Sequence, residues 1–362
     1  MTQTTTTGIC LAILLAAAPL AANAAVPSAG CGQSALASGS YTMVDQGITR
    51  TYRLHVPTGY RASTPAPLVA VFHGWGGNEN EFLGSTSVTS LANQRGYIVV
   101  APRGIGSGSP DASNNSWTFS GSATGLDGDG VSGIPGDTNA ICDTTKTPDY
   151  RYPSCKVTPA IAGNTCSWTH CQADDVAFAV ALVERIKSSM CVDAGRIYAA
   201  GGSNGGMLTW ELGQNPASAQ IFRAIAPLIG LPHRAYLRAQ GKTDAQGRRV
   251  DMPVLVITGT MDTTVPPGAW ENPSYTTTSN GSDRFYYTGA TAITRSWAQA
   301  NGCGLSTAVA FDDRNAKTDC RTYCSNVSGW PKVLDCRAKM GHTYSLSWSW
   351  KLVLNFFDRH VI

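Results

Sequence analysis

The stretch Arg196-Ile-Tyr-Ala-Ala-Gly-Gly-Ser-Asn-Gly-Gly-Met207 decides the fold of this chain. Its first half is a short apolar run that favours a buried strand, and its second half opens a segment that suits a helix. A tight turn from strand to helix leaves no room for side chains beside the central serine, so that glycines are needed on both sides of it. In a chain with 38 glycines the five-residue pattern alone also fits a plain Gly-rich turn. The strand before it and the helix after it favour Ser203 as a nucleophile.

Outward from this turn, short apolar runs bounded by Gly or Pro alternate with segments of helical period. That order predicts an α/β fold with a mostly parallel central sheet flanked by helices. The predicted strands are Tyr52 to Val56, Leu68 to Phe72, Tyr97 to Ala101, Arg196 to Ala200, Ala224 to Leu228, Val254 to Thr258 and Lys332 to Ala338. The predicted helices are Asp174 to Met190, Gly205 to Gln214, Ala290 to Asn301 and Ser345 to His360.

Two stretches do not follow the alternation. Residues 104–169 are rich in Gly, Ser, Asp, Pro and Cys without a sustained period, and so long an irregular segment is uncommon in a compact domain unless it is functional or cross-linked. We expect residues 104–172 to form a disulfide-braced, Cys-rich loop insertion near the active site. The basic stretch 231–251 is expected to be a solvated surface segment. No repeat or interdomain linker is visible, which favours a single catalytic domain over residues 25–362.

The N-terminus has the pattern of a secretory signal. An apolar run from Ile9 to Leu20 precedes Ala22-Asn23-Ala24, which fits an h-region followed by a cleavage site, although no basic residue precedes the run. We therefore expect residues 1–24 to be a signal peptide, with a retained anchor as the alternative. No later apolar run approaches the length of a membrane span, so the mature protein is expected to be secreted, extracellular and free of membrane.

The cysteines indicate a disulfide framework. Eleven are present, and removal of Cys10 with the signal leaves ten, enough for up to five bridges whose pairing the sequence does not fix. Short-range candidates are Cys142 with Cys155 and Cys166 with Cys171. A zinc site on the second of these pairs and His170 is the weaker alternative, because no second pair of ligands has matching spacing.

Composition argues against several classes of ligand. The formal net charge is only +3, and no run of Lys or Arg exceeds two residues, so no nucleic-acid partner is expected. The segment Asp127-Gly-Asp-Gly130 is similar to part of a calcium loop, but Val131 stands where an oxygen ligand is needed and no glutamate closes the loop. A plain turn is the preferred interpretation, and neither metal nor cofactor is expected.

A serine hydroxyl becomes a good nucleophile only when an imidazole removes its proton and a carboxylate orients that imidazole. After a strand-to-helix serine, the acid and then the histidine are expected further along the chain. Asp262 follows the buried strand Val254-Leu-Val-Ile-Thr-Gly259 and is the candidate acid, with a turn-capping role as the alternative. Asp251 and Asp283 fit worse because neither follows a buried strand.

His342 is the candidate base. It lies in Lys339-Met-Gly-His-Thr-Tyr344, after a predicted strand and before the C-terminal helix, whereas His360 lies inside that helix. His55 lies within a strand and His233 precedes the acid, so both are assigned structural roles.

Acyl transfer also needs preorganised hydrogen-bond donors for the developing oxyanion. The backbone N–H of Asn204 is one candidate. The second is expected from the loop His73-Gly-Trp-Gly-Gly77, which follows a predicted strand, and we assign it to Trp75 with Gly74 as the alternative. His73 is expected to brace this loop rather than to transfer protons. Trp75, Trp117 and Trp168 are expected to serve packing, as single tryptophans more often do, with an aromatic platform for a phenolic or sugar ring as the alternative.

Together these motifs resemble the secreted feruloyl esterases and polyhydroxybutyrate depolymerase-like esterases of carbohydrate esterase family 1, in the α/β-hydrolase superfamily. The resemblance spans most of the mature chain and rests on Ala29-Gly-Cys-Gly32, Arg50-Thr-Tyr-Arg-Leu-His-Val-Pro57, Phe72-His-Gly-Trp-Gly-Gly77, Asp174-Asp-Val176, Cys191-Val-Asp-Ala-Gly-Arg-Ile-Tyr198, Gly202-Ser-Asn-Gly-Gly-Met207 and Gly259-Thr-Met-Asp262. Around its histidine the family often has Gly-Gly-Gly-His-Thr-Trp-Pro, where this chain has Lys-Met-Gly-His342-Thr-Tyr-Ser. That departure bears on the substrate rather than on the mechanism.

The resemblance implies a serine carboxylic-ester hydrolase that works through an acyl-enzyme and needs no cofactor. It implies a feruloyl or related hydroxycinnamoyl ester of plant cell-wall polysaccharide as substrate, with polyhydroxyalkanoate and acetylated xylan as alternatives. A catalytically silent homologue that binds a glycan or a protein partner is the alternative from another class, because a fold does not guarantee chemistry. A peptidase is disfavoured because no gating domain is visible, and the oligomeric state stays open.

Overall fold

A computed structural model describes most of the chain. The described residues are 24–106, 114–119, 122, 141–143, 145–146, 152, 168–233, 251–271, 277–278, 284–324, 329–344 and 346–361. Nearly all of the predicted signal peptide, most of the predicted insertion, and most of the basic stretch 231–251 lie outside them. The calcium-like segment 127–130 and Asp283 lie outside them as well.

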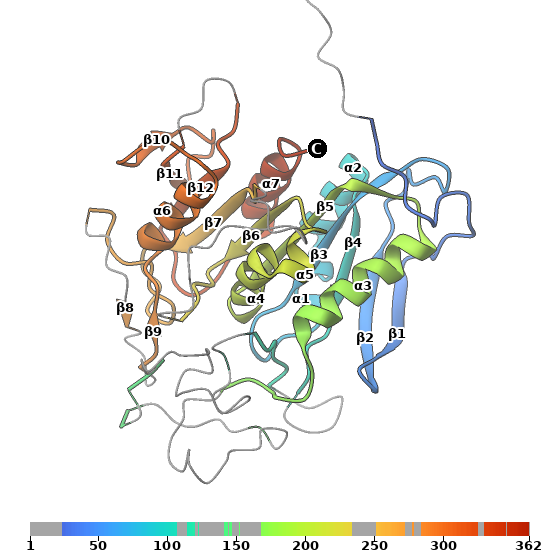
Figure 1. Cartoon of the computed structure of the whole chain (residues 1–362), viewed down its shortest axis with the longest axis horizontal. Helices are drawn as coiled ribbons and strands as arrows, with labels where there is room; N and C mark the ends of the chain where they lie inside the picture. The colour runs from blue at the N-terminus through green and yellow to red at the C-terminus, as the bar shows by residue number, and fades with distance from the viewer. Residues whose placement is uncertain are drawn as a thin grey trace, which may run out of the picture.

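A ten-stranded sheet forms the centre of the molecule (Figure 1). Its order is β1-β2-β4-β3-β5-β6-β7-β12-β11-β10, and the six strands from β4 to β12 in this order run parallel. The edge strands pair antiparallel. The bounds are β1 Gly39–Asp45, β2 Ile48–His55, β3 Ala66–Phe72, β4 Ile98–Pro102, β5 Val192–Gly202, β6 Ala224–Leu228, β7 Val254–Gly259, β10 Val309–Phe311, β11 Thr318–Thr322 and β12 Val333–Ala338, with a small separate pair of β8 Thr277–Thr278 and β9 Tyr286–Tyr287.

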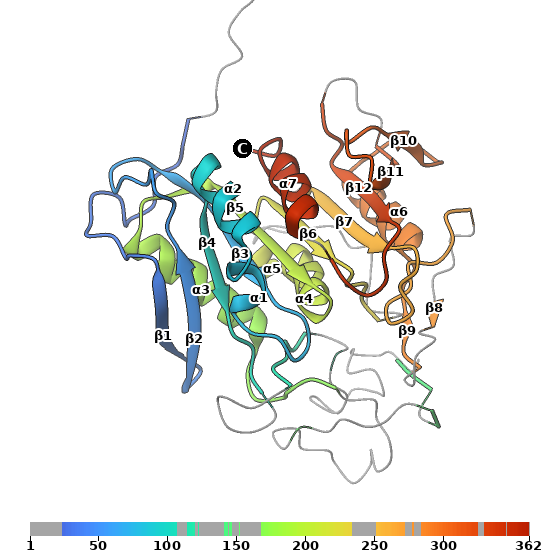
Figure 2. The ribbon, with the colours of Figure 1, turned by 180° about the vertical axis from the view of Figure 1, so that it is seen from behind.

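Helices cover both faces of the sheet. Figure 1 shows the face covered by α3 (Asp175–Ser189), α4 (Asn204–Gln214), α5 (Pro216–Ala219) and α6 (Ala290–Ala300). Figure 2 shows the other face, covered by α1 (Asn80–Leu83), α2 (Thr86–Arg95) and α7 (Leu346–Phe357). The central strands are therefore buried on both sides, which explains why they are continuous apolar runs rather than alternating ones.

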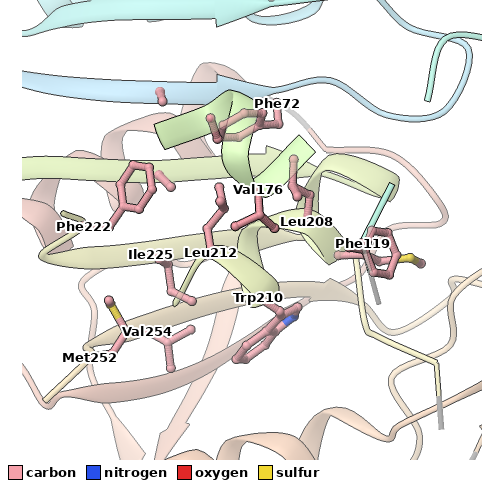
Figure 3. Close-up of a cluster of buried hydrophobic side chains, with 14 of the residues drawn as sticks. Phe72, Phe119, Val176, Leu208, Trp210, Leu212, Phe222, Ile225, Met252 and Val254 are labelled. Carbon is pink, nitrogen blue, oxygen red and sulfur yellow. The ribbon is translucent and has the colours of Figure 1, made fainter. Parts of the chain in front are cut away.

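Strand β3 illustrates how one short segment serves two cores. Leu68 and Phe72 belong to the hydrophobic cluster under α3 and α4, whereas Val69 and Val71 belong to the cluster under α2 and α7. Figure 3 shows the first cluster, where side chains of α3 and α4 pack toward the sheet. Because both faces are packed, the carboxyl ends of the parallel strands form one rigid edge, and the candidate site is built there.

The predicted α/β class is confirmed, and each predicted strand and helix is present, most of them with ends shifted by a few residues. Helix α3 begins one residue after Asp174, whose carboxylate accepts hydrogen bonds from the N–H groups of Val176 and Ala177. The edge strands β1, β10 and β11 and the short helices α1, α2 and α5 were not predicted. Strand β1 alternates half-buried and exposed residues, so it has no apolar run to reveal it.

Disulfides join segments that are far apart in the sequence as well as two neighbouring strands. Cys31 is bonded to Cys191, Cys303 to Cys324 and Cys320 to Cys336. Cys142 and Cys171 are disulfide-bonded as well, and the predicted partners of these two, Cys155 and Cys166, lie outside the described residues. Because Cys171 is bonded, it has no thiolate to offer to zinc. Within the described part of the chain, no helix is both long enough and apolar enough to cross a membrane.

Candidate active site

Ser203 lies at the turn from β5 to α4, in a strained backbone conformation. Its φ of 51° and ψ of −117° are rarely adopted by residues other than glycine. The turn is held from both sides, because the Ser203 N–H donates to the Leu228 carbonyl at 2.8 Å and the Ser203 carbonyl accepts from the Met207 N–H at 2.9 Å. The strain therefore persists in a fixed frame that lifts the serine hydroxyl above the sheet edge.

The glycines around Ser203 are needed because the turn packs directly on backbone. A Cβ atom at Gly205 would lie 2.2 Å from the Phe72 carbonyl oxygen at the end of β3. A Cβ atom at Gly201 would lie 2.3 Å from the Gly205 carbonyl oxygen. Backbone atoms cannot swing aside as a side chain can, so the flanking positions accept only glycine.

Gly205→Ala is therefore expected to lower the free energy of unfolding by about 1–3 kcal/mol, the usual cost of overpacking a tightly packed site. Urea-induced unfolding followed by circular dichroism measures this change. Gly59→Ala is the matched control, because a Cβ atom there meets nothing within 4 Å. Equal midpoints for the two variants would contradict the close approach of α4 to β3.

The structure brings Ser203, His342 and Asp262 together in one hydrogen-bonded chain. The Ser203 Oγ lies 2.9 Å from His342 Nε2, and His342 Nδ1 lies 2.8 Å from Asp262 Oδ2. The second oxygen of Asp262, Oδ1, accepts from the N–H groups of Thr264 and Val265 at 2.8 and 2.9 Å. The Asp262 side chain is fully buried, whereas that of His342 is 25% exposed. This arrangement can pass a proton from the hydroxyl to the imidazole.

The loops that carry the acid and the histidine are tied to each other. Strands β7 and β12 are parallel neighbours, with Gly259 opposite Ala338 at their carboxyl ends. Beyond them, the Met261 N–H donates to the Met340 carbonyl at 3.0 Å. A Cβ atom at Gly259 would lie 2.3 Å from that same carbonyl oxygen. The position of His342 relative to Asp262 is thus set by backbone contacts rather than by side chains alone.

Asn204, the predicted first donor, is the first residue of α4, so its N–H has no acceptor within the helix. Its buried side chain has a separate role that the sequence did not suggest. The amide oxygen accepts from the Trp117 N–H at 2.7 Å, and the amide nitrogen donates to the Trp117 carbonyl at 3.1 Å. This pair of bonds holds segment 114–119 against the turn at Ser203.

The loop with the predicted second donor is oriented by His73. The Gly74 carbonyl accepts from His73 Nδ1 at 2.7 Å and from the Gly77 N–H at 3.0 Å. The Gly74 carbonyl and the Trp75 N–H belong to the same trans, planar peptide and point in opposite directions. The contacts that hold the carbonyl therefore also fix the direction of the Trp75 N–H. The Gly74 N–H donates to Glu81 Oε1 at 2.9 Å, which favours Trp75 over Gly74 as the oxyanion donor.

His73 is placed to brace this loop. Its Nε2 accepts from the Gly104 N–H at 2.9 Å, while its Nδ1 donates to Gly74. Burial lowers the pKa of His73 to about 4, so the ring is neutral near pH 7 and carries one donor and one acceptor, as these two contacts require. His73 lies apart from the hydrogen-bonded chain at Ser203.

Trp117 has the packing role that we favour over an aromatic platform, because it is fully buried and donates from Nε1 to the His73 carbonyl at 2.8 Å. Trp75 is 39% exposed, and its Nε1 donates to the Tyr152 hydroxyl at 2.8 Å and to the Trp168 carbonyl at 3.0 Å. Trp168 in turn donates from Nε1 to Nε2 of the buried His233 at 2.9 Å. Trp75 and Trp168 are therefore linked.

The ends of the predicted insertion are anchored by a buried ion pair. Asp175 accepts from Arg50 Nη2 at 2.8 Å, and its other oxygen accepts from the Thr118 N–H at 2.7 Å and lies 2.8 Å from His170 Nε2. The Arg50 guanidinium lies 3.7 Å from the ring centre of Phe178, close enough for a cation–π contact. Arg50 and Asp175 both belong to motifs that carry the family resemblance, but no role could be assigned to either from the sequence alone.

This ion pair predicts acid sensitivity. Burial acts to raise the pKa of Asp175, but Arg50 and His170 more than offset it and lower the pKa from 3.8 to about 2. A folded-state pKa below the unfolded one stabilises the protein above pH 4, and the contribution, about 2 kcal/mol, is lost as the pH falls toward 2. Asp175→Asn is expected to flatten this loss in urea unfolding measured between pH 5 and pH 2. The control is Asp319→Asn, which removes an exposed carboxylate. If both variants lose the same stability between pH 5 and pH 2, the assignment of the acid sensitivity to Asp175 is contradicted.

The described residues offer little for a metal ion. The group Asp313, Cys320 and Cys336 has ligand-like spacing, but its two sulfur atoms are joined in a disulfide. A polar hollow of about 880 Å³ lies between residues 311–315, residues 329–330 and α7, and none of the three hydrogen-bonded residues at Ser203 lines it.

Comparisons with known proteins find feruloyl esterases among the similar sequences. No model of a known protein family matches the chain. A probable feruloyl esterase C of Aspergillus niger is 25% identical over 231 residues, 62% of this chain and 62% of that protein. A feruloyl esterase D of Neurospora crassa is 22% identical over 222 residues, 61% of this chain and 59% of that protein. The chain thus spans less than two thirds of the length of these curated relatives.

Among solved structures, an acetyl xylan esterase from Aspergillus awamori superimposes with a TM-score of 0.50 and 14% identity. The superposition covers 88% of this chain and 99% of that one. At this identity the likeness concerns the fold alone, and with the mostly parallel sheet it confirms the predicted α/β-hydrolase fold.

Proposed function

We propose that this chain, an α/β-hydrolase with feruloyl esterases among its relatives, is a serine carboxylic-ester hydrolase. The observation that carries the proposal is the continuous chain from the Ser203 hydroxyl through His342 to the buried Asp262, with contacts of 2.9 and 2.8 Å. Similarity to the two feruloyl esterases supports the same reaction. These contacts favour an active enzyme over the catalytically silent alternative.

In this proposal the Ser203 oxygen attacks the ester carbonyl while His342 Nε2 takes the hydroxyl proton. Asp262 holds Nδ1–H of the imidazole and stabilises the positive charge that the ring acquires. His342 then gives the proton to the leaving alcohol, which leaves an acyl-enzyme on Ser203. Water then attacks the acyl group while His342 takes its proton. His342 returns the proton to the Ser203 oxygen as the acid departs, which restores the serine hydroxyl.

The developing oxyanion is assigned to the backbone N–H groups of Asn204 and Trp75. The orientation of the Gly74 carbonyl by His73 and Gly77 supports Trp75, because it directs the next N–H away from that carbonyl. Each donor of this kind typically contributes about 3–4 kcal/mol to transition-state stabilisation.

For the substrate we propose a feruloyl or related hydroxycinnamoyl ester, carried by plant cell-wall polysaccharide. The names of the curated relatives support this acyl group. The exposed indole of Trp75, which belongs to the candidate oxyanion loop, offers an aromatic surface to a phenolic ring. Secretion belongs to the same proposal, because disulfides persist in oxidising compartments.

A substrate panel with covalent labelling tests this function. The chain is incubated with methyl ferulate, p-nitrophenyl acetate, acetylated xylan and a polyhydroxybutyrate film, and a fluorophosphonate adduct is located by peptide mass spectrometry. We expect the adduct on Ser203 and turnover of methyl ferulate. Activity on the film alone overturns the feruloyl assignment, and absence of any ester hydrolysis overturns the enzyme assignment.

A further inference from the structure

Tyr344 lies where three parts of the site meet. It follows His342 by two residues and packs its ring against Gly202, where an added Cβ atom would lie 2.2 Å from the Tyr344 hydroxyl oxygen. The same ring stacks on Phe82 of α1, with the ring centres 5.7 Å apart and the planes inclined by 27°. The tyrosine therefore touches the residue before Ser203 and the helix that follows the oxyanion loop.

Glu81, one residue before Phe82 on α1, joins these parts through hydrogen bonds. Its Oε1 accepts from the Gly74 N–H at 2.9 Å and also from the Tyr344 hydroxyl. The carboxylate also fills the space beside Gly77, where an added Cβ atom would lie 2.3 Å from Glu81 Oε2. Burial raises the pKa of Glu81, and both of the donors that its Oε1 meets are uncharged.

We propose that Glu81 and Tyr344 are a positioning pair for ester hydrolysis, in which the Glu81 carboxyl ties the oxyanion loop at Gly74 to the histidine loop at Tyr344. The inference rests on the proposed function of Ser203. The pair does not touch the reacting atoms. It fixes the spacing of the two loops that must act together on either side of Ser203.

Such spacing matters because the oxyanion donor and the imidazole belong to separate strand ends. The Trp75 N–H follows β3, whereas His342 follows β12, and the three strands β5, β6 and β7 lie between these two in the sheet. A shift of about 1 Å between catalytic groups can cost about 100-fold in rate. The Glu81 carboxyl connects Gly74 directly to Tyr344, so the two loops are held together without relying on the strands between them.

Glu81→Ala is therefore expected to lower kcat by about 10- to 100-fold with KM changed by less than about 3-fold, because alignment in the transition state is lost rather than substrate binding. Glu81→Gln keeps an acceptor oxygen of the same reach and is expected to stay within about 3-fold of the wild-type kcat. Glu184→Ala, on the exposed side of α3, is the matched control. All rates are measured on p-nitrophenyl acetate and methyl ferulate and divided by the fraction of active serine, titrated with a fluorophosphonate.

Tyr344→Phe tests the other end of the link, and it keeps the proposal testable even if Glu81→Ala fails to fold. We expect a fall in kcat of about 3- to 10-fold, because a single hydrogen bond is lost while the ring packing remains. Residues that act as one unit are not additive, so Glu81→Ala with Tyr344→Phe is expected to be no slower than Glu81→Ala alone.

The results separate the inference from the function on which it rests. If the wild type hydrolyses esters, Ser203→Ala does not, and Glu81→Ala keeps the wild-type kcat, the positioning role is overturned and the function stands. Equal losses in Glu81→Gln and Glu81→Ala also overturn it, because the acceptor oxygen then has no part. A wild type without esterase activity overturns both.

Discussion

Ser203→Ala protein is expected to hydrolyse esters about 10⁵-fold more slowly than the wild type, with its fold intact. Removal of the nucleophile of a serine hydrolase leaves only the rate enhancement that binding and the oxyanion donors provide, which is on the order of 10³- to 10⁴-fold over water. The loss should fall on kcat, since the hydroxyl forms a bond to the acyl carbon only as the reaction proceeds.

The substitution keeps the Cβ atom and therefore the packing of the turn, so that stability is expected to change by less than about 0.5 kcal/mol. Hydrolysis of p-nitrophenyl acetate and fluorophosphonate labelling measure the effect, and Ser188→Ala on the exposed surface of α3 is the control. An alanine protein that still turns over substrate at more than about one hundredth of the wild-type rate points to another nucleophile. In that case the labelled peptide identifies it.

The central sheet could be predicted because its parallel strands are buried on both faces and appear as apolar runs. Strands β6 and β7 begin where the sequence placed them, at Ala224 and Val254. The edge strand β1 has one face in solvent and mixes Thr, Ser and Gly with apolar residues, so no periodic signal marks it. The helices α1 and α5 have only four residues each, too short for a helical period to be visible.

The residues of the candidate site likewise include some that could be predicted from the sequence and some that could not. Ser203, Asp262 and His342 could be proposed because each follows a buried strand, and the parallel sheet brings such ends to one edge. Glu81 carries no such signal, because it is one polar residue on a short helix and its role comes from Gly74 and Tyr344, which lie close to it only in the folded chain. The same holds for the Asn204 side chain, whose partner Trp117 is 87 residues away.

Asp262→Asn is expected to lower kcat by about 10⁴-fold through the wrong imidazole tautomer rather than through loss of structure. The two oxygens of Asp262 are not equivalent, because Oδ1 accepts from the N–H groups of Thr264 and Val265 while Oδ2 faces His342. In the asparagine variant, the amide oxygen has to remain opposite those two donors. Turning the amide round would set its NH₂ group against them, at a cost of about 1–3 kcal/mol for each unmet donor.

The NH₂ group then faces His342 Nδ1 and makes that nitrogen an acceptor, so the ring proton moves to Nε2. An Nε2 that already carries a proton donates to Ser203 Oγ and cannot remove the hydroxyl proton. Asp262→Ala imposes no tautomer, and at pH 7 it is expected to retain at least as much activity as Asp262→Asn. The kcat values on p-nitrophenyl acetate and the urea midpoints of both variants test this order. If Asp262→Asn stays within tenfold of the wild-type kcat, the carboxylate does not set the tautomer of His342, and the proposed proton route from Ser203 has to be revised.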